Sequence, residues 1–280
     1  MRVQSTGPAP PPPRAIQLVA HRIRLHAVRM VARQGLGYLG QALSSAELMA
    51  TLFTSYLRSG LDHFVLSPGH YVIAAYAAAA ESGLLDPADL DAYGQDGSDL
   101  EAIGTERSPV ADITCGSLGQ GLSAAAGLAL SDRLRGIQVE TYALVSDGEV
   151  QEGQTWEAAM FAAHHGLDRL VVLLDCNNSQ VDGPVDSVST IEPLPAKWEA
   201  FGWTTQRVDG HDPGALVAAL DQAVASPKPA VVLADTSTRH GLDCLPADAD
   251  GHFIKLPTDL ADRAVAELET AILEAEAAVR

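Results

Sequence analysis

Two polar residues follow two apolar segments that are typical of buried strands. Asp147, with Gly148 after it, follows the segment 141–146, and Asn177 follows the segment 170–176. Carboxylate and amide oxygens are hard ligands that suit Mg²⁺ or Ca²⁺, and Mg²⁺ commonly takes further ligands from phosphate groups and water. Gly148 would let the backbone approach such a phosphate closely. These residue types therefore predict a site for a divalent cation and a phosphorylated ligand.

The pairs Asp147-Gly148 and Asn177-Asn178 also have an ordinary structural explanation. Asp-Gly is common in the turn after a strand, and Asn-Asn is common in loops, so each pair taken alone is more often structural than functional. However, Asp147 and Asn177 are separated by about 30 residues, the length of one strand–helix–strand unit. This spacing places both residues at the ends of neighbouring parallel strands, which favours one shared site.

The elements around these residues predict an α/β fold. Continuous apolar strands that alternate with helices are typical of a parallel sheet covered on both faces. We therefore expect a doubly wound, mainly parallel sheet whose ligands lie beyond the carboxyl ends of the strands. The expected strands are 63–66, 141–146, 170–176, 203–209 and 230–236, and the expected helices include 15–34, 46–58, 71–83, 154–166, 212–225 and 258–280. Ser44 or Ser45 would cap the helix at 46–58.

Composition limits the classes of function. The 280 residues are 47% hydrophobic, enough for a large core, and the formal net charge of -18 argues against a nucleic-acid or anionic-membrane partner. No apolar run reaches the roughly 20 residues of a membrane span. Three cysteines without CxxC spacing argue against disulfides and structural zinc, and they fit a reducing cytoplasm. We expect a disordered, proline-rich tail at 1–14 and one domain at 15–280.

Four segments together resemble the transketolase family of thiamine diphosphate enzymes. The segment 146–183 resembles the family's cofactor motif, which begins Gly-Asp-Gly and ends at Asn. The similarity continues in 116-GSLGQGL-122, 66-LSPGH-70 and 208-VDGHD-212, and it covers roughly residues 15–257. The resemblance implies the thiamine-diphosphate-binding fold, on the side that holds the diphosphate. It also implies that the cofactors are thiamine diphosphate and Mg²⁺, for which Ca²⁺ could substitute.

The resemblance implies roles for individual residues. Asp147, Asn177 and the carbonyl oxygen of Ser179 match the metal ligands. His70, Glu152 and His252 match catalytic positions, and Glu152 would communicate with a catalytic glutamate of a partner subunit. Glu152 could instead be a solvated glutamate that the helix dipole favours, and 251-GHFIK-255 departs from the family pattern around His252. The implied cofactor-binding residues are His70, Gly116, Leu118, Gly148, Glu152, Asn177, Val181 and His252.

Two family histidines are missing. Tyr38 in 37-GYLG-40 replaces the histidine of a Gly-His-Pro-Gly loop that handles the sugar donor, and Ile103 aligns approximately with a second histidine. The donor could therefore be a ketose phosphate or a smaller 2-oxo acid, which would make the protein an acyl transferase or acyloin synthase of specialised metabolism. Of the other histidines, we expect His211 to be a turn residue and His240 an exposed loop residue.

The resemblance also implies a second polypeptide. The catalytic glutamate of the family lies in a pyrimidine-binding domain, which would need well over about 150 further residues, and this sequence ends at Arg280. We expect the diphosphate-binding subunit of a cytoplasmic heterotetramer that transfers a two-carbon ketol or acyl unit between small molecules. Two alternatives are a non-catalytic scaffold subunit of the same fold and a Rossmann-type dinucleotide-binding module, for which 116-GSLGQG-121 is a weak signal.

Overall fold

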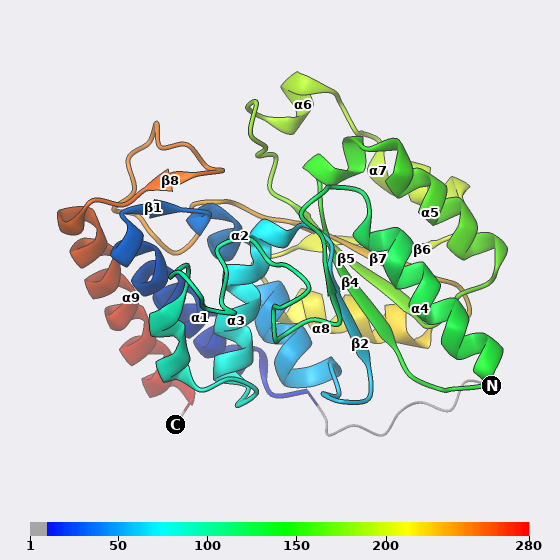
Figure 1. The fold of residues 1–280 in the computed structure, drawn as a ribbon, viewed down its shortest axis with the longest axis horizontal. Coiled ribbons are helices and arrows are strands. Elements are labelled where there is room, and N and C mark those ends of the chain that lie inside the picture. The colour runs from blue at the N-terminus through cyan, green and yellow to red at the C-terminus, as the bar shows by residue number, and fades with distance from the viewer. Residues whose placement is uncertain (1–9, 280) are drawn as a thin grey trace.

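The computed structural model describes residues 10–279, and a six-stranded sheet runs through its centre (Figure 1). The strand order is β3-β2-β4-β5-β7-β6, and all neighbouring strands are parallel. The strands are β2 (His63–Leu66), β3 (Ile113–Thr114), β4 (Thr141–Ser146), β5 (Leu170–Cys176), β6 (Thr204–Asp209) and β7 (Ala230–Asp235). Helices cover both faces, so the expected doubly wound, mainly parallel α/β fold is confirmed.

The sheet separates two hydrophobic cores, because alternate residues of each strand point to opposite faces. On one face, Leu144 and Leu173 pack with the helices α1 (Pro13–Gln34), α2 (Leu39–Thr51), α3 (Val72–Glu81), α8 (Pro213–Ala225) and α9 (Thr258–Val279). On the other face, Val145 and Leu174 pack with α4 (Gly121–Arg135), α5 (Gly153–His164) and α7 (Leu194–Ala200). Burial on both faces explains why these strands are apolar throughout.

The first helix begins two residues before the expected start of the domain, at Pro13. Proline suits the first turn of a helix, where its missing N–H has no intrahelical partner. Residues 1–9 of the expected tail lie outside the described residues. Helix α9 lies beside α1 in Figure 1, and the Arg22–Glu276 and Arg29–Glu269 ion pairs join the two helices. Within residues 10–279, none of the helices is both long and apolar enough to cross a membrane.

Helix α2 differs from the expectation. It begins at Leu39 rather than near residue 46, ends at Thr51, and continues as a π-helical turn, Leu52–Tyr56. Ser44 and Ser45 are therefore buried inside the helix and do not cap it. The Ser45 hydroxyl donates to the Gln41 carbonyl oxygen, four residues earlier, at 2.6 Å. The prediction was wrong because the last of the three glycines, Gly40, lies within the first turn of the helix rather than before it.

A small antiparallel sheet brings the end of the chain to the start of α2. It pairs β1 (Leu36–Gly37) with β8 (Ile254–Lys255). A Cβ on Gly40 would lie only 1.9 Å from the Gly251 carbonyl oxygen, so glycine is needed at this contact. The segment that carries His252 is thereby held against the N-terminal end of α2.

Candidate functional site

The predicted metal ligands lie together at the carboxyl edge of the sheet. Strands β4 and β5 are neighbours, with Ser146 opposite Asp175, so Asp147 and Asn177 follow adjacent strand ends. The Asp147 carboxylate accepts the backbone N–H of Asn178 at 2.6 Å and that of Gly148 at 2.8 Å. The Asn177 amide oxygen accepts the N–H of Ser179 at 2.9 Å. The structure therefore brings Asp147 and Asn177 together, as their spacing predicted, and Ser179 lies beside them.

The Asp147 carboxylate is buried without a counter-charge. Only 2% of Asp147 and 8% of Asn177 is exposed. Burial, together with the negative charge of Asp175, raises the pKa of Asp147 to about 7. Within residues 10–279, no lysine, arginine or histidine forms an ion pair with Asp147. A buried carboxylate is costly unless a cation neutralises it, so this donor set fits a divalent cation with oxygen ligands.

Gly148 allows the loop at 177–183 to fold back over the end of β4. A Cβ on Gly148 would lie 3.2 Å from the Cβ of Gln180, tighter than an ordinary contact. Asn178 has φ 55°, a left-handed conformation that asparagine tolerates better than most residues. The loop presents Val181 to solvent, with 77% of the residue exposed. An exposed valine on this edge is available for an apolar contact with a ligand.

Glu149 joins three of the segments that the family resemblance singles out. Its carboxylate is fully buried and accepts the Ser67 hydroxyl and, at 2.7 Å, the backbone N–H of Gly119. Burial raises its pKa to about 7. The sequence analysis missed this residue, although Glu149 stands within the motif at 146–183. It ties the turn at 66–70 and the loop at 116–121 to that motif.

The loop at 116–121 lies against the start of α5. A Cβ on Gly119 would approach the Cβ of Glu152 to 2.9 Å. Glu152 is exposed, is the residue immediately before the helix, and makes no side-chain capping hydrogen bond. Gly116 is exposed and Leu118 is half-buried. The loop at 116–121 is therefore in contact with the start of α5 and with Glu149.

The predicted histidines meet in an aromatic cluster. The His70 ring centroid lies 5.1 Å from that of His252, and the Tyr38 centroid lies 5.1 Å from His70 and 5.7 Å from His252. Phe253, which the sequence analysis did not single out, lies 5.1 Å from Tyr38. Tyr38 therefore lies beside both histidines.

Both histidines favour their neutral form. Burial and the charge of His252 lower the pKa of His70 to about 3. Burial lowers the pKa of His252, although the charge of Asp250 opposes this change. The Gln41 side-chain nitrogen lies 2.9 Å from Nδ1 of His252, and an amide donor there leaves the proton of the neutral ring on Nε2. Neutral imidazoles can orient and hydrogen-bond a substrate without adding charge.

Neighbouring residues connect the aromatic cluster to the metal ligands. The hydroxyl of Tyr71, next to His70, accepts from the Asn177 amide at 2.9 Å and donates to Asp175 at 2.8 Å. The Gly104 N–H donates to the Gly69 carbonyl oxygen at 2.9 Å, so the segment with Ile103 runs beside His70. Ile103 itself is 43% exposed.

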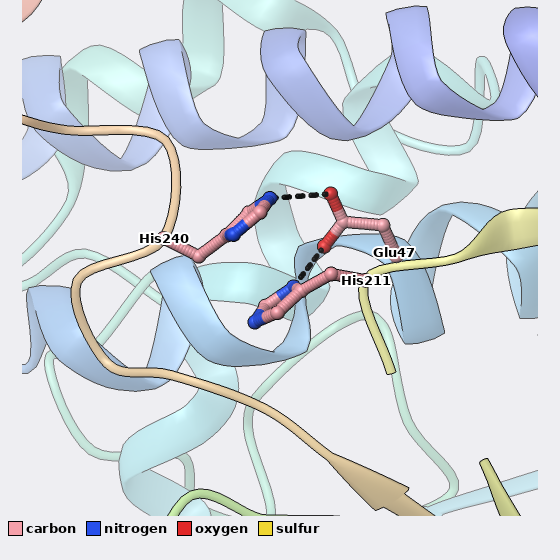
Figure 2. Close-up of side chains that lie close together, drawn as sticks. All are labelled: Glu47, His211 and His240. Atoms are coloured by element: carbon pink, nitrogen blue, oxygen red, sulfur yellow. Dashed lines mark hydrogen bonds and ion pairs between the residues drawn. The ribbon is translucent and has the colours of Figure 1, made fainter. Parts of the chain in front are cut away.

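A second group of polar side chains lies under α2 and was not expected. Figure 2 shows the carboxylate of Glu47, a fully buried residue of α2, beside the rings of His211 and His240. The Glu47 carboxylate lies 3.0 Å from His211 Nδ1 and 3.9 Å from His240 Nε2, and the two imidazole rings stack at 3.6 Å. His211 is therefore more than a turn residue, and His240 is only partly exposed.

The geometry of this second group opposes metal binding. Arg24 donates to both carboxylate oxygens of Glu47, at 2.7 and 2.5 Å, so the negative charge is already neutralised. The second ring nitrogen of His211, Nε2, accepts the Ser237 N–H at 2.9 Å and has no lone pair left for a cation. Although burial alone would raise the pKa of Glu47, Arg24 and His211 hold it well below its usual range. The group is a buried ion-pair network that anchors α2.

Comparisons with known proteins identify relatives of this chain. The sequence profile of the family described as "Transketolase, thiamine diphosphate binding domain" matches residues 15–259. The transketolase family protein y4mO of Sinorhizobium fredii is 43% identical over 85% of this chain and 89% of its own length. The 6-deoxy-6-sulfo-D-fructose transketolase subunit SqwG of a Clostridium species is 37% identical, over 91% of this chain and 96% of its own length.

Longer transketolases match this chain over less than half of their length. Human transketolase is 33% identical over 92% of this chain and 42% of its own length. The solved structure of transketolase from Leishmania mexicana superposes with a TM-score of 0.79 at 27% identity, covering 94% of this chain and 45% of that structure. The chain therefore belongs to the transketolase family and corresponds to its N-terminal, thiamine-diphosphate-binding part.

Proposed function

We propose that this chain is the diphosphate-binding subunit of a heteromeric, transketolase-like transferase. The observation that carries the proposal is the pair of Asp147 and Asn177 at adjacent strand ends, with the Asp147 carboxylate buried and unneutralised. Asp147, the Asn177 side-chain oxygen and the Ser179 carbonyl would hold Mg²⁺, and Ca²⁺ could substitute. When bound, thiamine diphosphate supplies an electron sink for breaking a carbon–carbon bond beside a carbonyl group.

The remaining residues of the site would bind and orient the ligands. The backbone at Gly116, Leu118 and Gly148, and the exposed side chain of Val181, would contact the cofactor. His70 and His252, being neutral, would exchange hydrogen bonds with substrate oxygens without attracting anions. Glu152 is exposed and so is free to reach a carboxyl group of a partner subunit.

A partner subunit that carries the pyrimidine-binding domain and the catalytic glutamate belongs to this proposal. The relative SqwG is named a subunit, and this chain covers 96% of its length. Two copies of each chain would give a heterotetramer with closed symmetry. The three cysteines are all free, which fits a cytoplasmic enzyme.

The two alternative functions have less support. A non-catalytic scaffold would gain stability by losing the buried charge of Asp147, yet this carboxylate is retained beside Asn177. A Rossmann-type site needs its glycine-rich turn after the first strand of a βαβ unit. Here 116-GSLGQG-121 follows β3, a two-residue strand at the edge of the sheet.

Two donor classes follow from different observations. The relative SqwG is named a 6-deoxy-6-sulfo-D-fructose transketolase subunit, which supports a ketose donor that carries an anionic group. Tyr38 supports a smaller 2-oxo acid donor, because its ring lies between the two histidines and the Phe253 ring. Ile103 cannot form the hydrogen bonds of a histidine, and each donor hydroxyl left unpaired on burial costs about 1–3 kcal/mol. We favour the small donor, with transfer of an acyl or ketol unit.

Steady-state kinetics on the reconstituted pair test the proposal. The partner would be sought in the adjacent open reading frame, and kcat/KM would be compared for pyruvate, hydroxypyruvate, xylulose 5-phosphate and 6-deoxy-6-sulfofructose. We expect turnover only with both chains, thiamine diphosphate and Mg²⁺, and a higher kcat/KM for pyruvate or hydroxypyruvate than for xylulose 5-phosphate. Turnover by this chain alone would contradict the half-enzyme, and a preference for xylulose 5-phosphate would contradict the small donor.

A further inference from the structure

Asp175 is an ionisable residue inside a buried strand of the sheet. It is the second-last residue of β5 and is fully buried, in an otherwise apolar segment. Its carboxylate accepts hydrogen bonds from four side chains of four different segments: Ser44, Tyr71, Asn177 and Thr236. Four hydrogen bonds hold the carboxylate in one orientation, because rotating it would break them.

Three of these donors meet at one oxygen, Oδ2. The Ser44 and Tyr71 hydroxyls donate to it at 2.6 and 2.8 Å, and the Asn177 amide nitrogen donates to it at 2.8 Å. A hydroxyl has a single proton, so a hydroxyl that donates to Asp175 turns its lone pairs elsewhere. The Tyr71 and Ser44 oxygens lie 2.9 and 3.3 Å from the same Asn177 nitrogen.

This arrangement decides which end of the Asn177 amide faces inward. The inner side of Asn177 is lined by three acceptor oxygens, from Asp175, Tyr71 and Ser44. An NH₂ group satisfies acceptors there, whereas an amide oxygen in the same place would be repelled by all three. The Asn177 oxygen must then point outward, where it accepts the Ser179 N–H.

We propose that Asp175 is a positioning residue that fixes the Asn177 amide with its oxygen toward the cation and its nitrogen toward the protein. The inference rests on the proposed metal site. Without the Asp175 acceptor the amide could rotate and turn its NH₂ group toward the cation. An amide NH₂ group cannot act as a ligand to a cation. Groups behind a metal ligand commonly set its orientation, and their loss costs about 10- to 100-fold in metal affinity.

Mn²⁺ is the probe for this role, because it takes the same oxygen ligands as Mg²⁺ and its binding is measured by electron paramagnetic resonance. The experiment uses the full chain with saturating thiamine diphosphate, and needs no turnover. Asp175→Asn replaces one of the two acceptor oxygens by an NH₂ group among donors that bond both oxygens, and we expect it to raise the Kd for Mn²⁺ about 10- to 100-fold. The double variant Asp175→Asn/Asn177→Asp exchanges the amide and the carboxylate, and we expect it to recover most of the affinity.

Thr236→Val is the matched control for a loss of stability alone. The Thr236 hydroxyl donates to the other carboxylate oxygen, Oδ1, and in the described part of the chain it forms no hydrogen bond with Asn177. We expect its Kd for Mn²⁺ to stay within a few-fold of wild type. Its melting temperature should fall, because Asp175 has lost a hydrogen-bond donor. An unchanged Kd in folded Asp175→Asn, or equal losses of affinity in Asp175→Asn and Thr236→Val, would overturn the positioning role. If the wild-type chain bound no Mn²⁺, the metal site itself would be wrong, and the inference with it.

Discussion

Ionisable side chains around the carboxyl edge of the sheet lie in surroundings that favour their uncharged forms. Burial raises the pKa of Asp147 and of Glu149 to about 7, and burial lowers the pKa of His70 to about 3. At neutral pH, Asp147 and Glu149 are then only partly ionised and His70 is uncharged. A ligand that supplies its own cation, as a magnesium diphosphate does, would stabilise the ionised form of Asp147. This interaction would in turn increase the affinity of the ligand.

His70 should make the protein sensitive to acid. Its folded-state pKa lies below the unfolded value of 6.5, so the stability it contributes is present above pH 6.5 and is lost as the pH falls toward 3. At pH 5 we expect this loss to be about 2 kcal/mol in the free energy of unfolding. Urea unfolding at pH 7.5 and pH 5 should show a smaller loss in His70→Gln than in wild type. His164→Gln, which changes an exposed histidine, should lose as much as wild type; equal losses in all three proteins would rule out the buried neutral imidazole.

Among single residues, the sequence predicts those whose position follows from the neighbouring sequence. Asp147 and Asn177 could be predicted because each directly follows a buried strand. Glu149 could not be, because its function depends on Ser67 and Gly119, which reach it from distant parts of the chain. For Asp175 the signal was present: a carboxylate within an apolar strand must find buried donors.

Among the elements, the strands and most helices follow from apolar patterns, but the start of α2 does not. Glycines usually indicate a break, and the actual start at Leu39 depends on tertiary packing, since every residue of the helix is buried. This earlier start brings Gln41 to His252 and Ser44 to Asp175. Pairing of β1 with β8 joins segments more than 200 residues apart, which local patterns cannot predict.

Two glycines of α4 provide a matched test of how closely the segments 66–70 and 116–122 must approach each other. A Cβ on Gly121 would lie 2.5 Å from the Cα of Ser67, whereas a Cβ on Gly127 would meet nothing within 4 Å. We expect Gly121→Ala to lower the free energy of unfolding by about 1–3 kcal/mol, because backbone must move. Gly127→Ala should raise it by about 0.5–1 kcal/mol through better helix propensity. Urea unfolding of both variants measures these changes. An unchanged free energy of unfolding in Gly121→Ala would mean that the two segments can move apart without cost.

In the molecule as a whole, both faces of the sheet are covered, while part of the candidate site is exposed. Two cores fill both faces of the sheet, while Gly116, Glu152 and Val181 face solvent at one end of it. These are positions that the family resemblance assigns to the cofactor or to the partner. A partner subunit therefore stays a proposal, supported by the similarity to SqwG.

The central claim is that the chain holds thiamine diphosphate through a cation bound by Asp147 and Asn177. Isothermal titration calorimetry of thiamine diphosphate, with and without Mg²⁺, tests it on the full chain and on the reconstituted complex. We predict binding that requires Mg²⁺, no measurable binding in Asp147→Ala, and strongly weakened binding in Asn177→Ala, because the diphosphate loses its bridging cation. Affinity that is independent of Mg²⁺, or unchanged in both variants, would contradict the account.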